Sequence, residues 1–266
     1  MSTVTVVASV EALNVPPRVR LDVTDIGATV AAGAVTVNRL DPDGRLVPVR
    51  TQDGNPLTLS TSGINKVGLV YDYEMPLGAT VQYTTTEDPS TSSGEVTVPS
   101  SQVWLVHPGV PALSQPIEIR VGSFQEETLP VKQGVFYPMG RKSPIVVSDG
   151  TRHSGQSSFT VSTETADELA AMRDLLDDGG PLLLNVPAAV GIGVDTAYIS
   201  VADVTITRPS DVGSDALRDI KMPYTVIDRP SGGSQSERTY IDLLSVPTYG
   251  DLLTLYPTYL DVLAGP

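Results

Sequence analysis

The sequence contains no cysteine, and this absence excludes disulfides, thiolate metal sites and cysteine nucleophiles. It fits a protein that is made in a reducing cytoplasm. Basic residues are also scarce: 17 Lys and Arg stand against 31 Asp and Glu, the net charge is −14, and no basic cluster occurs. Because a nucleic-acid surface needs positive charge to displace phosphate counterions, we expect no nucleic-acid partner.

Long apolar runs are missing as well. No segment approaches the ~20 apolar residues of a transmembrane helix, so we expect no membrane insertion. The opening residues MSTVTVVASVEALNV lack the basic region of a signal peptide, and Glu11 interrupts their apolar run. We therefore expect neither a membrane anchor nor a secretory leader.

Motifs that carry chemistry are absent too. The two histidines, His107 after a predicted strand and His153 in a polar loop, are far apart and belong to no H-E-x-x-H motif. There is no G-x-S-x-G nucleophile elbow and no phosphate-binding G-x-x-x-x-G-K loop. We expect no catalytic residue, no cofactor, no metal ion and hence no enzyme. A pair of acids for glycoside hydrolysis stays open, because the separation of such acids is spatial.

Short strands joined by turns are what the composition favours, since Val and Thr are abundant and the chain has 23 Gly and 22 Pro. We expect a mainly β protein whose residues 1–100 form a two-sheet β-sandwich of the immunoglobulin or fibronectin-III kind. Alternating patterns and turn residues place its strands at Thr3–Val10, Arg18–Val23, Ala34–Leu40, Leu46–Arg50, Lys66–Tyr73, Thr80–Thr85 and Gly94–Val98.

Residues 101–230 predict a second β-rich domain, resembling a split barrel, in which Asp149-Gly150 turns one hairpin. Its expected strands are Gln102–Val106, Ile117–Val121, Val135–Tyr137, Ile145–Val147, Ser157–Ser162, Leu182–Asn185, Ala197–Ile206 and Ile220–Asp228. One helix is predicted over residues 165–178, because Thr165 and Glu168 match a capping box and Gly179 follows as a stop. An apolar stripe along this helix favours packing on the sheet over binding a partner.

The C-terminal part does not have the pattern of a β domain. Residues 231–238 (SGGSQSER) predict a linker, and residues 239–266 repeat the pattern T-Y-x-D-L/V-L three times as short helical turns. So apolar a tail must be buried against its own body or against a neighbouring subunit, and the sequence leaves both open. The candidate inter-subunit docking residues are Tyr240, Leu243, Leu244, Tyr249, Leu252, Leu253, Tyr256, Tyr259, Val262 and Leu263.

Several motifs, taken in order, resemble minor tail proteins of phages and prophages of actinobacteria. In the first domain they are VNRLDPDG (37–44), VPVR (47–50) and YDYEMPLG (71–78). In the second they are WLVHP (104–108), GVFYPMGR (134–141), PIVV (144–147), LLLNVP (182–187) and PYTVIDRP (223–230). The repeated tail also resembles this group. The strand–helix–strand layout of the second domain is similar to the ring-forming domain of distal tail proteins of siphophages.

This resemblance implies a structural subunit of the phage tail tip or baseplate. Such a protein would be made in the host bacterial cytoplasm and reside in the virion tail. Its partners would be copies of itself, in a hexameric or trimeric ring, and other tail proteins such as the tail tube and the tip hub. An alternative is a host-surface carbohydrate-binding module, which needs an exposed aromatic platform. A hydrolase ranks last.

Overall fold

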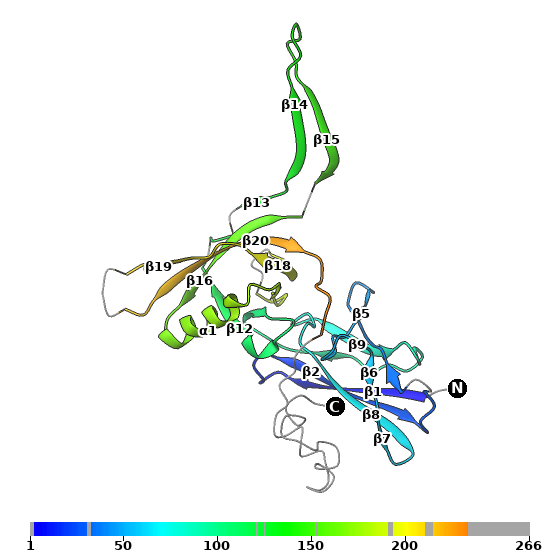
Figure 1. The fold of residues 1–266 in the computed structure, drawn as a ribbon. Coiled ribbons are helices and arrows are strands. Elements are labelled where there is room, and N and C mark those ends of the chain that lie inside the picture. The colour runs from blue at the N-terminus through cyan, green and yellow to red at the C-terminus, as the bar shows by residue number, and fades with distance from the viewer. Residues whose placement is uncertain are drawn as a thin grey trace.

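The structure is a computed structural model that describes residues 3–30, 33–120, 122–124, 126–152, 154–190, 194–210 and 215–233. Strands account for 47% of the chain and helices for 7%, so the predicted mainly β class is confirmed. Two β-rich units follow each other along the chain and pack against each other (Figure 1).

The first unit consists of two four-stranded antiparallel sheets. One has the order β1 (Thr3–Glu11), β2 (Arg18–Ile26), β8 (Asn65–Asp72), β7 (Ser60–Ser62). The other has the order β10 (Val96–Thr97), β9 (Thr80–Thr85), β4 (Val37–Leu40), β5 (Leu46–Pro48). A short pair, β3 (Ala34–Val35) with β6 (Leu57–Thr58), lies beside them.

Alternation of side chains explains how these sheets share one core. In β2, Val19, Leu21 and Val23 are buried, while the residues between them are partly exposed. Because successive side chains of a strand point to opposite faces, one face of each sheet can bury its apolar residues against the other sheet. Residues of both sheets, including Val81 and Tyr83 of β9, belong to the same buried cluster.

The second unit contains a closed barrel of six strands. Its strands, in order around the barrel, are β16 (Gln156–Thr163), β12 (Gln115–Ile119), β11 (Val103–Val106), β17 (Leu182–Asn185), β18 (Ala197–Val201) and β20 (Arg218–Ile227). The pairing of β20 with β16 closes the ring. Short strands β13 (Glu127–Thr128) and β19 (Thr205–Thr207) extend it, and a 3₁₀ turn, η1 (Pro111–Leu113), precedes β12.

The helix α1 (Ala166–Asp177) begins as its sequence predicts. The Thr165 side chain accepts a hydrogen bond from the backbone N–H of Glu168, and the Glu168 side chain accepts one from the N–H of Thr165, which completes the capping box. Gly179 follows the helix with a φ of 64°, a conformation that favours glycine. Met172 and Leu175 are buried in the same cluster as the barrel interior, so the helix packs on the barrel as expected.

Strands β11 and β17 are buried on both faces because they serve two cores. Leu105 and Leu184 point into the barrel, while Trp104 and Leu183 belong to the core of the first unit. One pair of strands therefore packs inward against its own barrel and outward against the sandwich, and this shared burial holds the two units together.

The structure also corrects several predicted boundaries. The predicted strand Ala197–Ile206 is two strands, β18 and β19, and the short strands β6 and β7 were not predicted. The predicted turn at Asp149-Gly150 is wrong, because both residues lie inside β15 (Ile145–Arg152). Gly150 has a φ of 75°, and the register with β14 (Val131–Phe136) shifts at this point, so the glycine serves a β-bulge instead of a turn.

Candidate functional site

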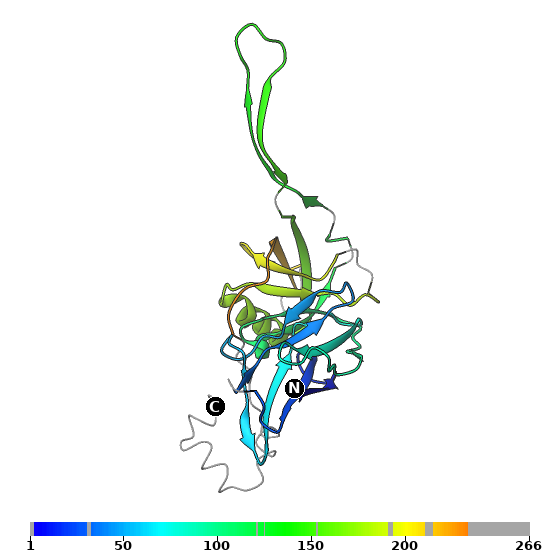
Figure 2. The same ribbon diagram turned by 90° about the vertical axis from the view of Figure 1, so that its right-hand side faces the viewer.

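Strands β14 and β15 form a two-stranded hairpin that stands clear of the body of the molecule, called here the arm (residues 131–152; Figures 1 and 2). No other strand of the described chain pairs with either of them. The arm is rooted in the barrel, because β15 ends at Arg152 and β16 begins at Gln156. At about 3.3 Å per residue, the eight steps from Val131 to Met139 carry the tip roughly 25 Å outward.

The tip of the arm is a loop over residues 137–144. The Arg141 N–H donates to the carbonyl oxygen of Pro138 over 3.2 Å, and Gly140 between them has a φ of 82°. Such a backbone conformation is open to glycine at little cost, so the sequence Pro-Met-Gly-Arg favours this turn. It leaves the Met139 side chain fully exposed at the end of the arm.

Apolar side chains cover the outer half of the arm, yet none of its described side chains is buried. Tyr137 is 76% exposed, Phe136 59% and Val147 58%. Because paired residues of antiparallel strands share a face, Phe136, Ile145 and Val147 lie on one face of the ribbon. Val135 and Val146 lie on the other face. A ribbon that is apolar on both faces has no solvent side, and exposed apolar patches of this kind mark interaction sites.

The arm also carries a charge opposite to that of the rest of the protein. Lys132, Arg141, Lys142 and Arg152 are basic and Asp149 is acidic, which gives the arm a formal charge of +3. The whole chain has −14, so the remainder carries −17. In the sequence only Arg141 and Lys142 are adjacent, because Lys132 lies on β14, Arg152 on β15 and the other two in the tip loop. The hairpin brings them onto one ribbon.

A second feature lies on the barrel, where β12 and β16 pair at two positions, Glu118 with Ser162 and Ile119 with Val161. Beside this short pairing lies a groove of about 470 Å³, called here the β12–α1 groove, between β12, the end of β16 and α1. Buried apolar side chains form its floor, and its lining contains three glutamates and no lysine or arginine. The glutamates are Glu118, Glu164 and Glu168, all exposed.

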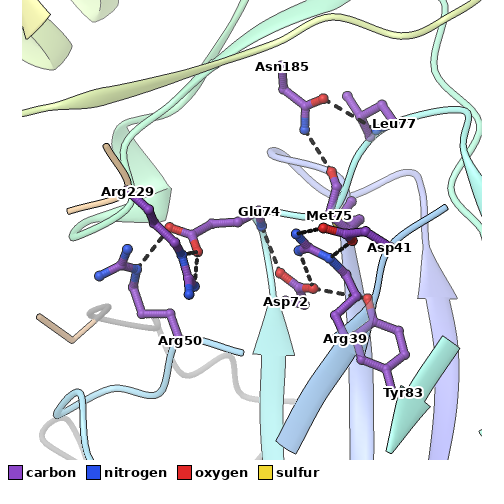
Figure 3. A network of polar contacts seen from close by, with 10 residues as sticks. All are labelled: Arg39, Asp41, Arg50, Asp72, Glu74, Met75, Leu77, Tyr83, Asn185 and Arg229. Atoms are coloured by element: carbon purple, nitrogen blue, oxygen red, sulfur yellow. Dashed lines mark hydrogen bonds and ion pairs between the residues drawn. The ribbon is translucent and has the colours of Figure 1, made fainter. Parts of the chain in front are cut away.

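Charged side chains at the junction of the two units are, by contrast, fully paired. Glu74 of the first unit accepts hydrogen bonds from Arg50 (Nε to Oε1, 2.9 Å) and from Arg229 (Nε to Oε2, 3.0 Å), as Figure 3 shows. Asn185 of β17 donates to the Met75 carbonyl over 2.8 Å and accepts from the Leu77 N–H. These contacts fix the barrel, and with it the root of the arm, to the sandwich.

A second buried network lies deeper in the sandwich (Figure 3). Asp72 accepts hydrogen bonds from Arg39 (2.8 Å) and from the Tyr83 hydroxyl (3.0 Å). Burial alone would lower the pKa of Arg39, but the charge of Asp72 and the contacts with Asp41 outweigh it and raise that pKa. The pKa of Tyr83 is raised, mainly by burial and to a smaller extent by the nearby charge of Asp72. Both groups therefore keep their protons and serve as permanent donors to Asp72, a structural role.

His107 lies directly after β11 and is buried in a fully formed turn. Its Nδ1 accepts a hydrogen bond from the Val110 N–H over 2.8 Å, so its Nε2 donates to Asp178, which lies 2.9 Å away. The Ser114 hydroxyl oxygen accepts from the backbone N–H of His107 and is not bonded to the ring. These contacts engage both ring nitrogens of His107, and none of them forms a serine–histidine pair. His153 lies outside the described residues.

The described residues hold neither a metal-binding cluster nor a membrane-spanning helix. They contain no group of three or more His, Asp and Glu residues that could hold a metal ion. No helix among them is long and apolar enough to cross a membrane.

All ten predicted docking residues of the C-terminal repeat, Tyr240 to Leu263, lie outside the described part of the chain, and so do most of the predicted linker and the predicted helical turns. Sequence reasoning did not predict that the arm is an exposed hairpin with no third strand beside it. It placed strands at Val135–Tyr137 and Ile145–Val147 but assumed that they pack in a sheet. The available signal was the run Val-Phe-Tyr-Pro-Met, which lacks the alternation of a half-buried strand.

Comparison with known proteins does not assign the chain to a family. No protein-family model matches the chain, and no curated protein matches it significantly.

Proposed function

We propose that this protein is a structural, non-enzymatic subunit of a phage tail tip or baseplate, and that it acts by docking onto neighbouring chains. The observation that carries the docking role is the arm, whose apolar side chains on both faces have no partner within the described chain. An isolated two-stranded hairpin is at best marginally stable in water, so a partner that covers it would order it and bury its apolar surface.

The location in a phage tail rests on the ordered motifs described above. Three of them bear on the arm and its support: GVFYPMGR and PIVV supply the tip and the adjoining ends of β14 and β15, and PYTVIDRP supplies the second half of β20 and Arg229. On this proposal the sandwich is of the immunoglobulin or fibronectin-III kind and the barrel is of the distal-tail kind. Copies of the chain form a closed ring, hexameric or trimeric, that contacts the tail tube and the tip hub. The helical turns of the repeated tail dock on a neighbour.

A host-glycan-binding module has less support. Such modules present exposed aromatic rings to the sugar, yet Tyr71, Tyr73 and Tyr83 of the sandwich are buried. Among the described residues, the aromatic side chains that are strongly exposed, Phe136 and Tyr137, both lie on the arm. An enzyme is not favoured either, because both ring nitrogens of the described histidine are engaged, one with the Val110 N–H and the other with Asp178.

The location can be tested in intact particles. The chain carrying a small C-terminal epitope tag would be produced by the phage that encodes it, and purified particles would be labelled with antibody-coated gold and imaged. We expect label at the distal end of the tail in a fixed number of copies per particle. Label absent from particles, or bound only to host cell walls, would contradict the proposal and favour the glycan-binding alternative.

A further inference from the structure

We propose that the tip of the arm docks into the β12–α1 groove of a second copy of this chain. This docking rests on the assembly role proposed above and names the surface that receives the arm. Both partners are present in the same sequence, and each has what the other lacks: the arm exposes apolar and basic groups, and the groove combines an apolar floor with an acidic rim.

The apolar part of the fit involves the floor of the groove. Val103, Ile117, Val161 and Met172 line it, and they belong to the barrel core. A volume of about 470 Å³ lies within the range of roughly 300–1,000 Å³ that is usual for pockets that enclose apolar groups. Met139 is the arm's terminal side chain and is unbranched, so it can adapt to an irregular apolar floor.

The charged part of the fit involves the rim. Arg141 and Lys142 follow Met139 by two and three residues, so a tip that inserts Met139 brings both cations to the groove mouth. Glu118 and Glu164 line that mouth, and their side chains are exposed. Opposite charges at the edge of an interface steer the approach and fix its register. The part of a second copy outside the arm carries a net charge of −17, so the acidic rim of the groove would repel it. This repulsion favours the basic arm as the occupant.

The occupant must come from another copy, because in both views the arm points away from α1 and β12 of its own chain (Figures 1 and 2). The arm and the groove are different surfaces of one subunit, so their contact is heterologous. Repeated contacts of this type either close into a ring or continue as a filament. A closed ring is the outcome that the proposed function requires.

The absence of native cysteine makes a direct test possible. An untagged Met139→Cys chain would be mixed with a tagged Glu118→Cys chain under mild oxidation, and disulfide-linked heterodimers would be quantified on a non-reducing gel by their intermediate mass. The matched control replaces Glu118→Cys with Glu95→Cys, an exposed glutamate of the sandwich. Docking raises the effective concentration of the two thiols, so we expect roughly tenfold or more heterodimer over the control.

A heterodimer yield equal to the Glu95→Cys control, in chains that sedimentation shows to associate, would overturn the groove as the receiving surface and leave the assembly role intact. A chain that stays monomeric up to high concentration would overturn docking onto a second copy. Neither result would decide the location in the tail, which the labelled particles test separately.

A charge reversal provides an independent test. The variant Arg141→Glu/Lys142→Glu should lose most self-association, because two like-charged contacts replace two attractive ones. Combining it with Glu118→Lys/Glu164→Lys should restore association, whereas Glu95→Lys/Asp203→Lys, which adds the same charge elsewhere, should not. Equal rescue by both pairs would show that only net charge matters and would contradict a specific groove.

Discussion

At the junction between sandwich and barrel, the Glu74 side chain is 3% exposed and lies between two arginines, whereas on the arm the apolar Phe136 is 59% exposed. The junction buries charge and satisfies it; the arm exposes apolar surface and leaves it uncovered. Buried charges cost free energy unless each has its ion-pair partner. Exposed apolar surface costs free energy unless another surface covers it. The junction therefore depends on the fold of this chain alone, whereas the arm, on the proposed function, depends on other chains. Four variants test this account.

Glu74→Gln should have the largest effect on folding. Removing the carboxylate leaves Arg50, whose side chain is 7% exposed, without its charged partner. Loss of one member of a buried ion pair costs about 3 kcal/mol or more. Urea unfolding would measure the change, with Glu95→Gln as the exposed control. A loss below about 0.5 kcal/mol, the range of ordinary surface substitutions, would mean that the junction does not stabilise the chain.

Asn185→Ala should have the next largest effect. The Asn185 side chain satisfies the Met75 carbonyl and the Leu77 N–H, both at the interface of the two units. Leaving buried backbone groups without partners costs about 1–3 kcal/mol. Gln133→Ala on the arm, where the side chain is exposed, is the matched control. Equal effects of the two substitutions on the free energy of unfolding would remove the contrast between junction and arm.

Asp25→Asn should give a pH-dependent effect within the sandwich. Burial works against ionisation of Asp25, but hydrogen bonds from Val30 and Thr29 outweigh it and lower the pKa of this carboxyl. A lowered folded-state pKa contributes stability that is fully present above the unfolded pKa of about 3.9 and is lost as pH falls through the folded value. The stability difference between wild type and variant should thus be constant from pH 7 to 5 and shrink below pH 4. A difference that grows on acidification would contradict this sign.

Tyr137→Ser/Met139→Ser should have the smallest effect on folding. Both side chains are exposed, so the free energy of unfolding of the monomer should change by no more than about 0.5 kcal/mol. Self-association, measured by sedimentation, should weaken strongly in the same variant. A large loss of stability with unchanged association would mean that these side chains serve the fold of their own chain.

More of the fold than of the candidate site could be predicted from the sequence. Alternation in β2 and β9 and the capping box at Thr165 are local patterns, and local physics determines their outcome. Closure of the barrel by β16 and β20, and the double burial of β11, depend on pairings between distant segments that no local pattern contains.

The arm was missed for a related reason. Val135 and Ile145 have the composition of buried strand residues, and composition does not reveal whether a third strand will pair beside them. The misplaced turn at Asp149-Gly150 arose because a bulge and a hairpin turn use the same glycine conformation. The resemblance to tail proteins remains a prediction.

The most direct test asks whether another chain covers the tip of the arm after assembly. The thiol of a Met139→Cys variant would be labelled with a maleimide in the free subunit and in purified particles, and the two rates compared. We expect fast labelling of the free subunit and labelling slowed by roughly tenfold or more in the particle, because the covered thiol reacts only when the contact opens. Equal rates in both states would show that the arm stays exposed after assembly and would contradict its role in docking.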